Sequence, residues 1–257
     1  MRTLSLAAGT LLTVLTFSMT DAQAASTVSK EITAAVADPA RPDDPDRKRD
    51  IDRKPAESVA FAGVKPGQSV VDLLPGGGYF TRIFSAVVGP KGHVYALPPP
   101  RRPDAPADRP DPAAATQAIA ADAHYSNVTV LVQRLTDLSL PAPVDIAWTS
   151  RNYHDLHNIP NVDVVAIDKK IFEALKPGGT FIVLDHAAEK GSGFRDTSTL
   201  HRVDGEAVRK EVESAGFKFV GQSEILRNPN DPHTAKVFDS TVQDKTDQFI
   251  LKFRKPK

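Results

Sequence analysis

A run of three glycines directly after a short apolar segment is the sequence feature that most constrains the fold. The segment 69–74 reads Ser-Val-Val-Asp-Leu-Leu, and a proline and the glycines 76–78 follow it. From Phe80 to Val87, apolar residues recur at the spacing of an amphipathic helix, and Gly89-Pro90 then provides the kind of stop that ends helices. The stretch therefore predicts a strand, a tight glycine turn and a helix, which together open a nucleotide-binding βαβ unit.

The same stretch predicts a ligand site. Glycine allows a close approach of the backbone to a ligand, and the start of the following helix directs free N–H groups towards it. Asp72 falls where the strand should end, so its carboxylate must face a polar partner. A plain tight turn would explain the glycines alone, but the acid at this position favours a nucleotide-type pocket.

Further apolar segments alternate with helical patterns along the rest of the chain. Besides the segment at 69–73, strands are predicted at 93–97, 128–132, 144–148, 180–184, 217–226 and 247–253. Helices are predicted between them. This alternation predicts an α/β fold with a doubly wound, mostly parallel, seven-stranded Rossmann-like sheet, helices on both faces and an antiparallel last strand. The predicted domain spans residues 54–257.

The segment Asp72–Gly78 resembles the first motif of the class I S-adenosylmethionine-dependent methyltransferases, in which an acid precedes a G-x-G turn. Leu175–Gly179 and the apolar strand after it are also similar to that fold. From about residue 50 to 256, the pattern resembles predicted bacterial methyltransferases that carry export signals. The resemblance implies methyl transfer from S-adenosylmethionine to a small-molecule acceptor, with cofactor contacts at Asp72, Pro75, Gly76, Gly77, Gly78, Tyr79, Leu97 and Asp137.

Two positions depart from the family pattern. Leu74 stands where the family usually has its first glycine, and Pro98 stands where an acid usually holds the ribose hydroxyls. The proline-rich segment 98–112 is predicted to be an extended surface loop, either a ligand lid or an insertion without a role. These departures keep a second hypothesis open, a catalytically inactive binding protein that retains the fold.

Two His/Asp pairs follow strands that should be neighbours in this fold. Asn152-Tyr153-His154-Asp155 comes after the strand at 144–148, and Asp185-His186 comes after the strand at 180–184. Because ligands of open parallel sheets bind outside the carboxyl ends of the strands, we expect these residues to converge. The predicted catalytic residues are His154, Asp155, His186 and Tyr153.

The expected roles follow from the chemistry of these side chains. A histidine titrates near neutral pH and suits removal of a proton from the acceptor. Either His154 or His186 is expected to be this base, with Asp155 or Asp185 as its orienting partner and Tyr153 packed against cofactor or substrate. His201 and Arg202, from the loop that follows, are expected to close over the site. An alternative is a divalent metal held by His154, Asp155, Asp185 and His186.

Composition excludes several other classes of function. The chain of 257 residues is 40% hydrophobic and 25% charged, which is ordinary for a globular protein. Lysine plus arginine and aspartate plus glutamate are equal at 32 each, so no net charge favours nucleic acid or an anionic membrane surface. There is no cysteine, which excludes disulfides and thiol chemistry. The oligomeric state is not predicted.

The first residues predict export. An arginine at position 2, an apolar run from Leu4 to about Met19 and the small-x-small sequence Ala22-Gln23-Ala24 are typical of a signal peptide over residues 1–24. The alternative is a short membrane anchor, but the run is short and rich in threonine and serine for a span. The mature protein is then expected in the periplasm or outside the cell, without stable membrane insertion. Residues 25–53 lack apolar periodicity and are predicted to be a solvated arm. The alternative is that Arg49, Asp50 and Arg53 fold over the pocket as a lid.

Overall fold

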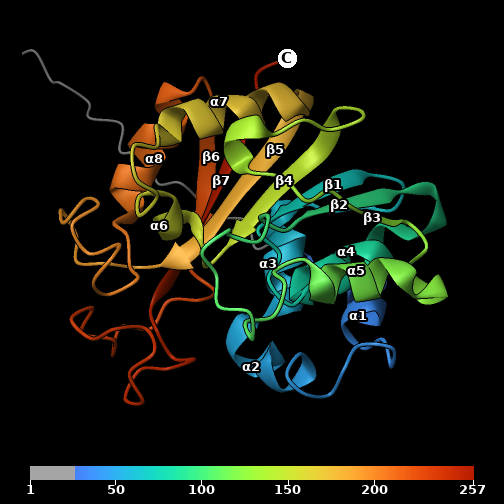
Figure 1. The fold of residues 1–257 in the computed structure, drawn as a ribbon, viewed down its shortest axis with the longest axis horizontal. Coiled ribbons are helices and arrows are strands. Elements are labelled where there is room, and N and C mark those ends of the chain that lie inside the picture. The colour runs from blue at the N-terminus through green and yellow to red at the C-terminus, as the bar shows by residue number, and fades with distance from the viewer. Residues whose placement is uncertain (1–26) are drawn as a thin grey trace, which may run out of the picture.

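The computed structural model describes residues 27–257, and a seven-stranded sheet forms its centre (Figure 1). The strand order is β3-β2-β1-β4-β5-β7-β6. All neighbouring strands are parallel except that β7 runs antiparallel to both β5 and β6. The predicted doubly wound sheet with an antiparallel last strand is therefore confirmed. The predicted signal peptide lies outside the described residues.

The strands lie close to their predicted positions. Their bounds are β1 Ser69–Leu73, β2 His93–Leu97, β3 Val128–Val130, β4 Val144–Ser150, β5 Leu175–His186, β6 Lys218–Ser223 and β7 Gln248–Arg254. β5 begins earlier than predicted because Leu175 already pairs with Val144 across a bulge. The segment Lys176–Gly179 is therefore the first part of a strand.

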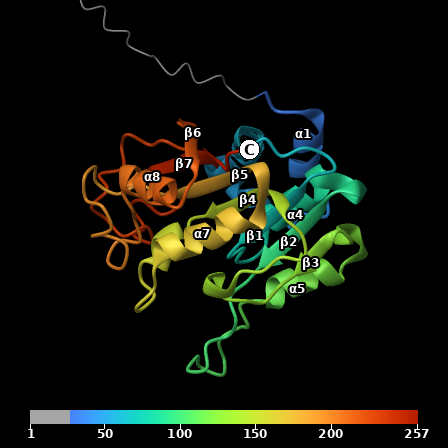
Figure 2. The same cartoon turned by 90° about the horizontal axis from the view of Figure 1, so that it is seen from above.

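Helices cover both faces of the sheet (Figures 1 and 2). One face carries α1 Lys30–Val36, α3 Pro55–Ala62, α4 Tyr79–Val88 and α5 Ala114–Ala121, and the other carries α6 Tyr153–Leu156, α7 Val164–Ala174 and α8 Gly205–Ser214. The short helix α2, Asp50–Arg53, lies beyond the carboxyl edge of the strands. No helix among the described residues is long and apolar enough to cross a bilayer.

Successive strand residues point into two separate cores, as the pleat requires. In β1, Val70 belongs to the core under α4, and Val71 belongs to the core under α7. In β4, Trp148 packs at a tilt against Phe80 and edge-on against Phe84 of α4, with ring centres 4.7 and 5.4 Å away. Burial on both faces explains why these strands read as continuous apolar runs.

The N-terminal segment is not a solvated arm, so that prediction is wrong for residues 30–53. Ile32 and Ala35 of α1 are buried in the core that includes α4. The fully buried Arg41 donates to both carboxylate oxygens of Asp50 at 2.9 and 2.7 Å. A helix of seven residues offers too few apolar positions to reveal a buried face from sequence alone, because only tertiary packing stabilises it.

Candidate active site

The glycine turn between β1 and α4 contains three left-handed residues. Leu74, Gly76 and Gly78 have φ values of 51°, 55° and 77°. Leu74 takes this conformation without being a glycine, and its N–H donates to the carbonyl of Leu97 at 3.1 Å. A left-handed leucine costs about 1 kcal/mol, which the surrounding structure must offset. The chain therefore keeps the turn conformation even though the family's first glycine is replaced.

The three glycines have different surroundings. A Cβ on Gly76 or Gly77 would meet no atom within 4 Å, and both residues are exposed, so the space over this part of the turn is open. A Cβ on Gly78 would lie 2.2 Å from Cδ1 of Ile119. Gly76 and Gly77 therefore fit the predicted cofactor contacts, whereas Gly78 is needed for the close packing of α5.

Asp72 lies buried at the base of this turn. Its Oδ2 accepts a hydrogen bond of 2.6 Å from the Thr81 hydroxyl. Burial raises the pKa of Asp72 to about 7, although Thr81 and the charge of Arg53 act in the opposite direction. A buried carboxylate of this kind is stabilised by a cationic ligand group.

Asn152 joins the glycine turn to the histidine-bearing loop. Its side-chain amide donates to the carbonyl of Leu74 at 2.9 Å, and its carbonyl oxygen accepts from the Thr149 hydroxyl. The sequence prediction assigned no role to Asn152. A short polar residue directly after a buried strand was the only available signal, because the partner lies 78 residues away.

His154 is the side chain that the structure most clearly prepares for chemistry. Its Nδ1 and its backbone N–H bind the two oxygens of Asp185, both at 2.8 Å. Burial alone lowers the pKa of His154, but the carboxylates of Asp185 and Asp155 outweigh burial and raise the pKa above its ordinary value. Asp185 is fully buried and also accepts from the His186 N–H, so it stays ionised and holds the imidazole in one orientation.

His186 has a different character. Its Nδ1 lies 2.7 Å from the Thr246 hydroxyl, which also accepts from the Gln248 amide. Burial lowers the pKa of His186 to about 3, so the ring is neutral at physiological pH. Of the two predicted bases, His154 therefore fits the role, and His186 serves as a neutral neighbour with its ring centre 6.2 Å away.

Asp155 and His201 complete the exposed side of the site. Asp155 Oδ1 lies 3.4 Å from His154 Nε2 and 3.6 Å from His201 Nδ1. One ligand atom from each of the three residues lies within 4.8 Å of the others, a spacing compatible with one divalent cation. The predicted metal set was different. The group that lies close enough includes His201 and omits Asp185 and His186, whose Oδ1 and Nδ1 atoms take part in hydrogen bonds.

Two predicted site residues belong to the packing of the domain instead. The Tyr153 ring is fully buried, and its hydroxyl bonds with Asp168 at 2.7 Å and Glu211 at 2.8 Å between α7 and α8. Arg202 is fully buried in a bidentate ion pair with Asp231. Neither side chain is available to a ligand, so the expected ligand contact of Tyr153 and the closing role of Arg202 are corrected.

The remaining predicted cofactor residues also differ in whether they border the glycine turn. Pro75 is half-buried, and its carbonyl closes the turn by accepting from the Gly78 N–H. The Leu97 side chain is fully buried in the core under α7, so only its backbone borders the turn. Asp137 is exposed in a single-turn helix, Leu135–Asp137, and acts there as a turn residue. Tyr79 donates its hydroxyl to Asp50 at 2.6 Å.

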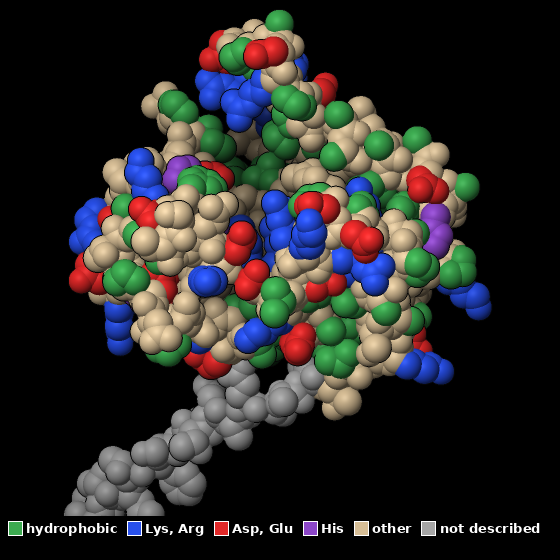
Figure 3. All heavy atoms as spheres, turned by 90° about the horizontal axis from the view of Figure 1, so that it is seen from below, with side chains coloured by type: hydrophobic (Ala, Val, Ile, Leu, Met, Phe, Trp, Pro, Cys, Tyr) green, Lys and Arg blue, Asp and Glu red, His purple; other side chains and the backbone are tan. Residues whose placement is uncertain are grey.

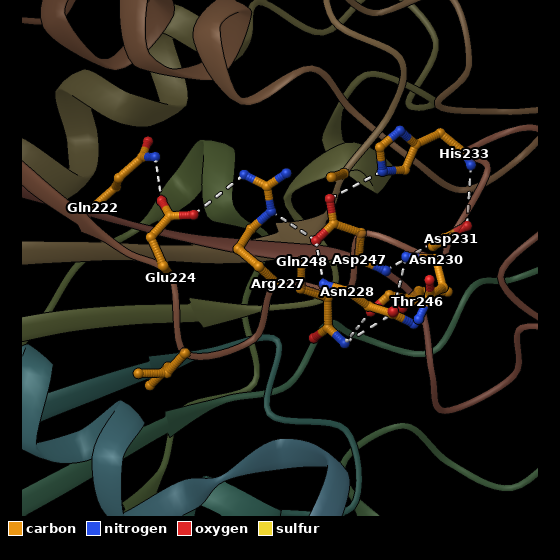
Figure 4. A network of polar contacts seen from close by, with 12 residues as sticks. Gln222, Glu224, Arg227, Asn228, Asn230, Asp231, His233, Thr246, Asp247 and Gln248 are labelled. Atoms are coloured by element: carbon orange, nitrogen blue, oxygen red, sulfur yellow. Dashed lines mark hydrogen bonds and ion pairs between the residues drawn. The ribbon is translucent and has the colours of Figure 1, made fainter.

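A network of hydrogen bonds and ion pairs in the C-terminal loop supports the site (Figure 4). Asp247 accepts from Arg227, the Asn228 N–H and His233 at 2.8, 2.7 and 3.0 Å. This network fixes the start of β7, where Thr246 contacts His186 and Gln248 contacts Arg151. Sequence patterns gave no signal for it, because its members come from separate irregular segments.

The face of the molecule seen from below is hollowed (Figure 3). Viewed from below, Lys and Arg side chains gather beside the hollow (Figure 3). The proline-rich loop 98–112 projects from the molecule in Figure 2. Its tip is stabilised by internal bonds, among them Arg101 to the carbonyls of Pro106 and Arg109. The predicted extended surface loop is therefore present, and its role as lid or insertion stays a prediction.

Comparison with known proteins gives a consistent picture. No protein-family model matches the chain. A ubiquinone/menaquinone biosynthesis C-methyltransferase of Vibrio cholerae is 26% identical over 198 residues, which is 70% of this chain and 65% of that enzyme. The chain thus spans less than two-thirds of this relative's length. In structure, an S-adenosylmethionine-dependent methyltransferase from Aquifex aeolicus aligns with a TM-score of 0.55 at 19% identity, covering 82% of this chain and 94% of the other.

This chain has the class I methyltransferase fold. The glycopeptide N-methyltransferase MtfA, solved with S-adenosylmethionine, aligns with a TM-score of 0.52 at 15% identity, covering 78% of this chain and 86% of that one. The resemblance predicted from the glycine turn is confirmed by both kinds of comparison. The likeness to exported members of the group stays a prediction.

Because Arg202 and Asp231 are both fully buried, we expect Asp231→Asn to lower the free energy of unfolding by about 3–5 kcal/mol. The substitution leaves the Arg202 charge buried without a counter-charge. Urea denaturation monitored by circular dichroism measures the change. Asp104→Asn, in the exposed pair with Arg102, is the matched control and should change nothing measurable. Equal stability of Asp231→Asn and wild type would contradict this account of the pair.

Proposed function

We propose that this protein transfers the methyl group of S-adenosylmethionine to a small-molecule acceptor. The observation that carries the proposal is the His154–Asp185 pair, joined through Asn152 to an open glycine turn at the carboxyl edge of the sheet. The Vibrio cholerae relative is named for a quinone-biosynthesis methylation. A small aromatic or quinone-like acceptor is therefore the first class to screen.

The residues present fit the cofactor. The exposed turn at Gly76 and Gly77 offers backbone to a nucleoside, and buried Asp72 suits its ammonium group. When bound, S-adenosylmethionine supplies an electrophilic methyl group on a sulfonium sulfur. The protein's part is then to align the acceptor and to take its proton on His154 Nε2, while Asp185 stabilises the charged imidazole.

Two binding measurements test this proposal against a binding protein without catalysis. Calorimetry with S-adenosylmethionine and with S-adenosylhomocysteine should show binding of both. Turnover on an acceptor panel then separates an enzyme from an inactive binder.

Repeating the turnover assay after chelation and after addition of zinc or manganese tests the metal alternative, because a free base at His154 requires no metal. Binding of neither cofactor form by folded protein would refute the proposal.

The pH dependence of turnover should identify the base. The rate is expected to rise with pH through a pKa above 6.5, because His154 must be deprotonated and its neighbouring carboxylates raise its pKa. His186 cannot produce this step, since its pKa of about 3 keeps it neutral throughout the assay range. A profile of kcat from pH 5 to 9 measures it. A rate independent of pH across this range, with chemistry limiting, would argue against His154.

We also propose that the mature protein is exported, on the basis of the signal-like residues 1–24. The intact mass of protein recovered from the native host tests this directly. A mature chain beginning near Ala25 in the periplasm or medium is expected. A full-length chain in the cytoplasm would contradict it.

A further inference from the structure

A cavity of about 300 Å³ lies at the amino edge of the sheet, the edge opposite to the proposed active site. It lies where β1 and β4 begin and β7 ends, near the end of the chain marked C in Figure 1. Four cationic side chains and one carboxylate are among the residues that line it: Lys65, Lys176, Lys252, Arg254 and Asp145. The cavity therefore carries an excess of positive charge, in a chain whose charges balance overall.

Two copies of one tripeptide bring lysines to this cavity. Lys-Pro-Gly occurs at 65–67, shortly before β1, and again at 176–178, in the first part of β5. β1 and β5 both pair with β4, so their amino ends lie on either side of its first residues. Lys65 and Lys176 therefore line the same cavity although they are far apart in the sequence. The proposed methyl transfer gives neither lysine a role.

The end of β7 supplies the other two cations. Ile250, Lys252 and Arg254 occupy alternate positions on one face of this strand, and Ile250 is buried in the core that includes α4. Lys252 thus takes a half-buried place that the strand pattern gives to an apolar residue. Its Nζ donates to the carbonyl of Phe61 at 2.8 Å, and Arg254 donates to the carbonyl of Gly178 at 3.2 Å. Both cations are therefore held by neutral carbonyl groups.

The carboxylate in the cavity wall is already in use. Asp145 Oδ2 accepts from Lys176 Nζ at 2.8 Å, and from the backbone N–H and the hydroxyl of Ser69 at 2.8 and 3.0 Å. These bonds, Lys176 foremost, keep the pKa of Asp145 below its ordinary value although burial acts in the opposite direction. The negative charge of Asp145 is therefore matched by one lysine of the four cations.

The other three cations have no counter-charge in the part of the chain that the structure describes. No ion pair among residues 27–257 includes Lys65, Lys252 or Arg254, and the nearest acid in the cavity wall is held by Lys176. Burial lowers the pKa of Lys252, and the charges of Arg254 and Lys65 lower it further. Like charges gathered in a partly desolvated place are stabilised by a bound anion.

We propose that this cavity binds a small compound with two linked phosphate groups. Ammonium and guanidinium groups hold phosphate oxygens by charge-assisted hydrogen bonds. The volume of about 300 Å³ far exceeds the roughly 30 Å³ of one water molecule in the liquid, so two linked phosphates have room to reach cations on different walls. None of the residues that line the cavity is aromatic, so the site offers no ring on which a base could stack.

Calorimetry with inorganic pyrophosphate at constant ionic strength tests the proposal. Wild type should bind it, and Lys252→Met and Arg254→Met should each weaken binding by about ten- to a hundredfold. Arg254→Lys keeps the charge and should recover part of the affinity. Lys170→Met is the matched control, because Lys170 is an exposed cation of α7 outside the cavity, and it should bind as wild type does.

A second ligand distinguishes two sources of the same chemistry. ADP carries the diphosphate on a nucleoside, whereas pyrophosphate carries it free. ADP binding that is as tight as pyrophosphate binding and is lost in Lys252→Met would support the site and identify a nucleotide as its ligand. Weaker ADP binding, with pyrophosphate still dependent on Lys252, would support the site and identify a free diphosphate.

The variants should stay folded. Arg254 is exposed, and Lys252→Met replaces a half-buried charge with an apolar side chain of similar length, so neither should lower the melting temperature without ligand. Failure of folded wild type to bind pyrophosphate, or equal affinity of wild type and both methionine variants, would overturn the proposal. An equal loss in Lys170→Met would also overturn it, because the attraction would then come from surface charge in general.

Discussion

Gly76→Val is expected to abolish binding of S-adenosylmethionine while the sheet stays folded. The space over Gly76 is open in the protein, so the valine meets no atom of the chain and instead occupies the place proposed for the cofactor. Its φ of 55° disfavours a side chain and costs about 1–2 kcal/mol, which a domain of ordinary stability tolerates. Calorimetry should show an affinity loss of about a hundredfold or more.

Two neighbouring glycines provide the controls. Gly77→Val adds the same bulk over the same open space without a positive φ, so it should also weaken binding and should cost less stability. Gly78→Val places its Cβ 2.2 Å from Ile119 and should instead destabilise the domain. Wild-type affinity in Gly76→Val and Gly77→Val would mean that the pocket lies elsewhere.

His154→Ala is expected to reduce turnover by about a hundredfold or more, with cofactor affinity changed only a few-fold. His154 Nε2 faces the exposed side of the site, where Asp155 and His201 lie, and the glycine turn touches neither nitrogen of its ring. Steady-state kinetics and calorimetry on the same preparation measure the two quantities. His124→Ala, at a half-exposed histidine paired with Asp38, is the matched control and should keep full activity.

Asp185→Asn tests the origin of the basicity. An asparagine can still occupy the position but removes the negative charge that raises the pKa of His154. The rate should fall, and the apparent pKa in the pH profile should decrease. Wild-type turnover in His154→Ala, on an acceptor identified by screening, would place the base at another residue.

The structure shows how the N-terminal segment proposed as a lid contacts the glycine turn and α4. Asp46 binds Arg82 at 2.9 Å, and Asp50 binds the Tyr79 hydroxyl, so the segment 41–53 is tied to the first turns of α4. Arg82 also donates to the carbonyl of Gly77 at 3.0 Å. The segment therefore braces the glycine turn and brings Arg53 to it. Charge-rich, proline-broken sequence concealed this role, because its stability comes from partners far along the chain.

The sequence alone determined the fold class and the place of the glycine turn. Apolar periodicity and the glycine and proline residues that end helices and strands are local signals. The stretch from β1 to α4 contains its own strand, turn and helix signals within 20 residues. The topology then brought the residues after β4 and β5 to one edge. For this reason, His154 and Asp185 could be named as neighbours before any contact was known.

Only the tertiary structure decided which side chains face that edge. Tyr153 and His154 are adjacent in sequence, but the first points into the core under α7 and the second towards Asp185. His154 and His186 look alike in sequence, and their opposite pKa shifts arise from the groups packed around them. Burial, partner charges and donor saturation depend on residues tens of positions away, so local patterns do not determine them.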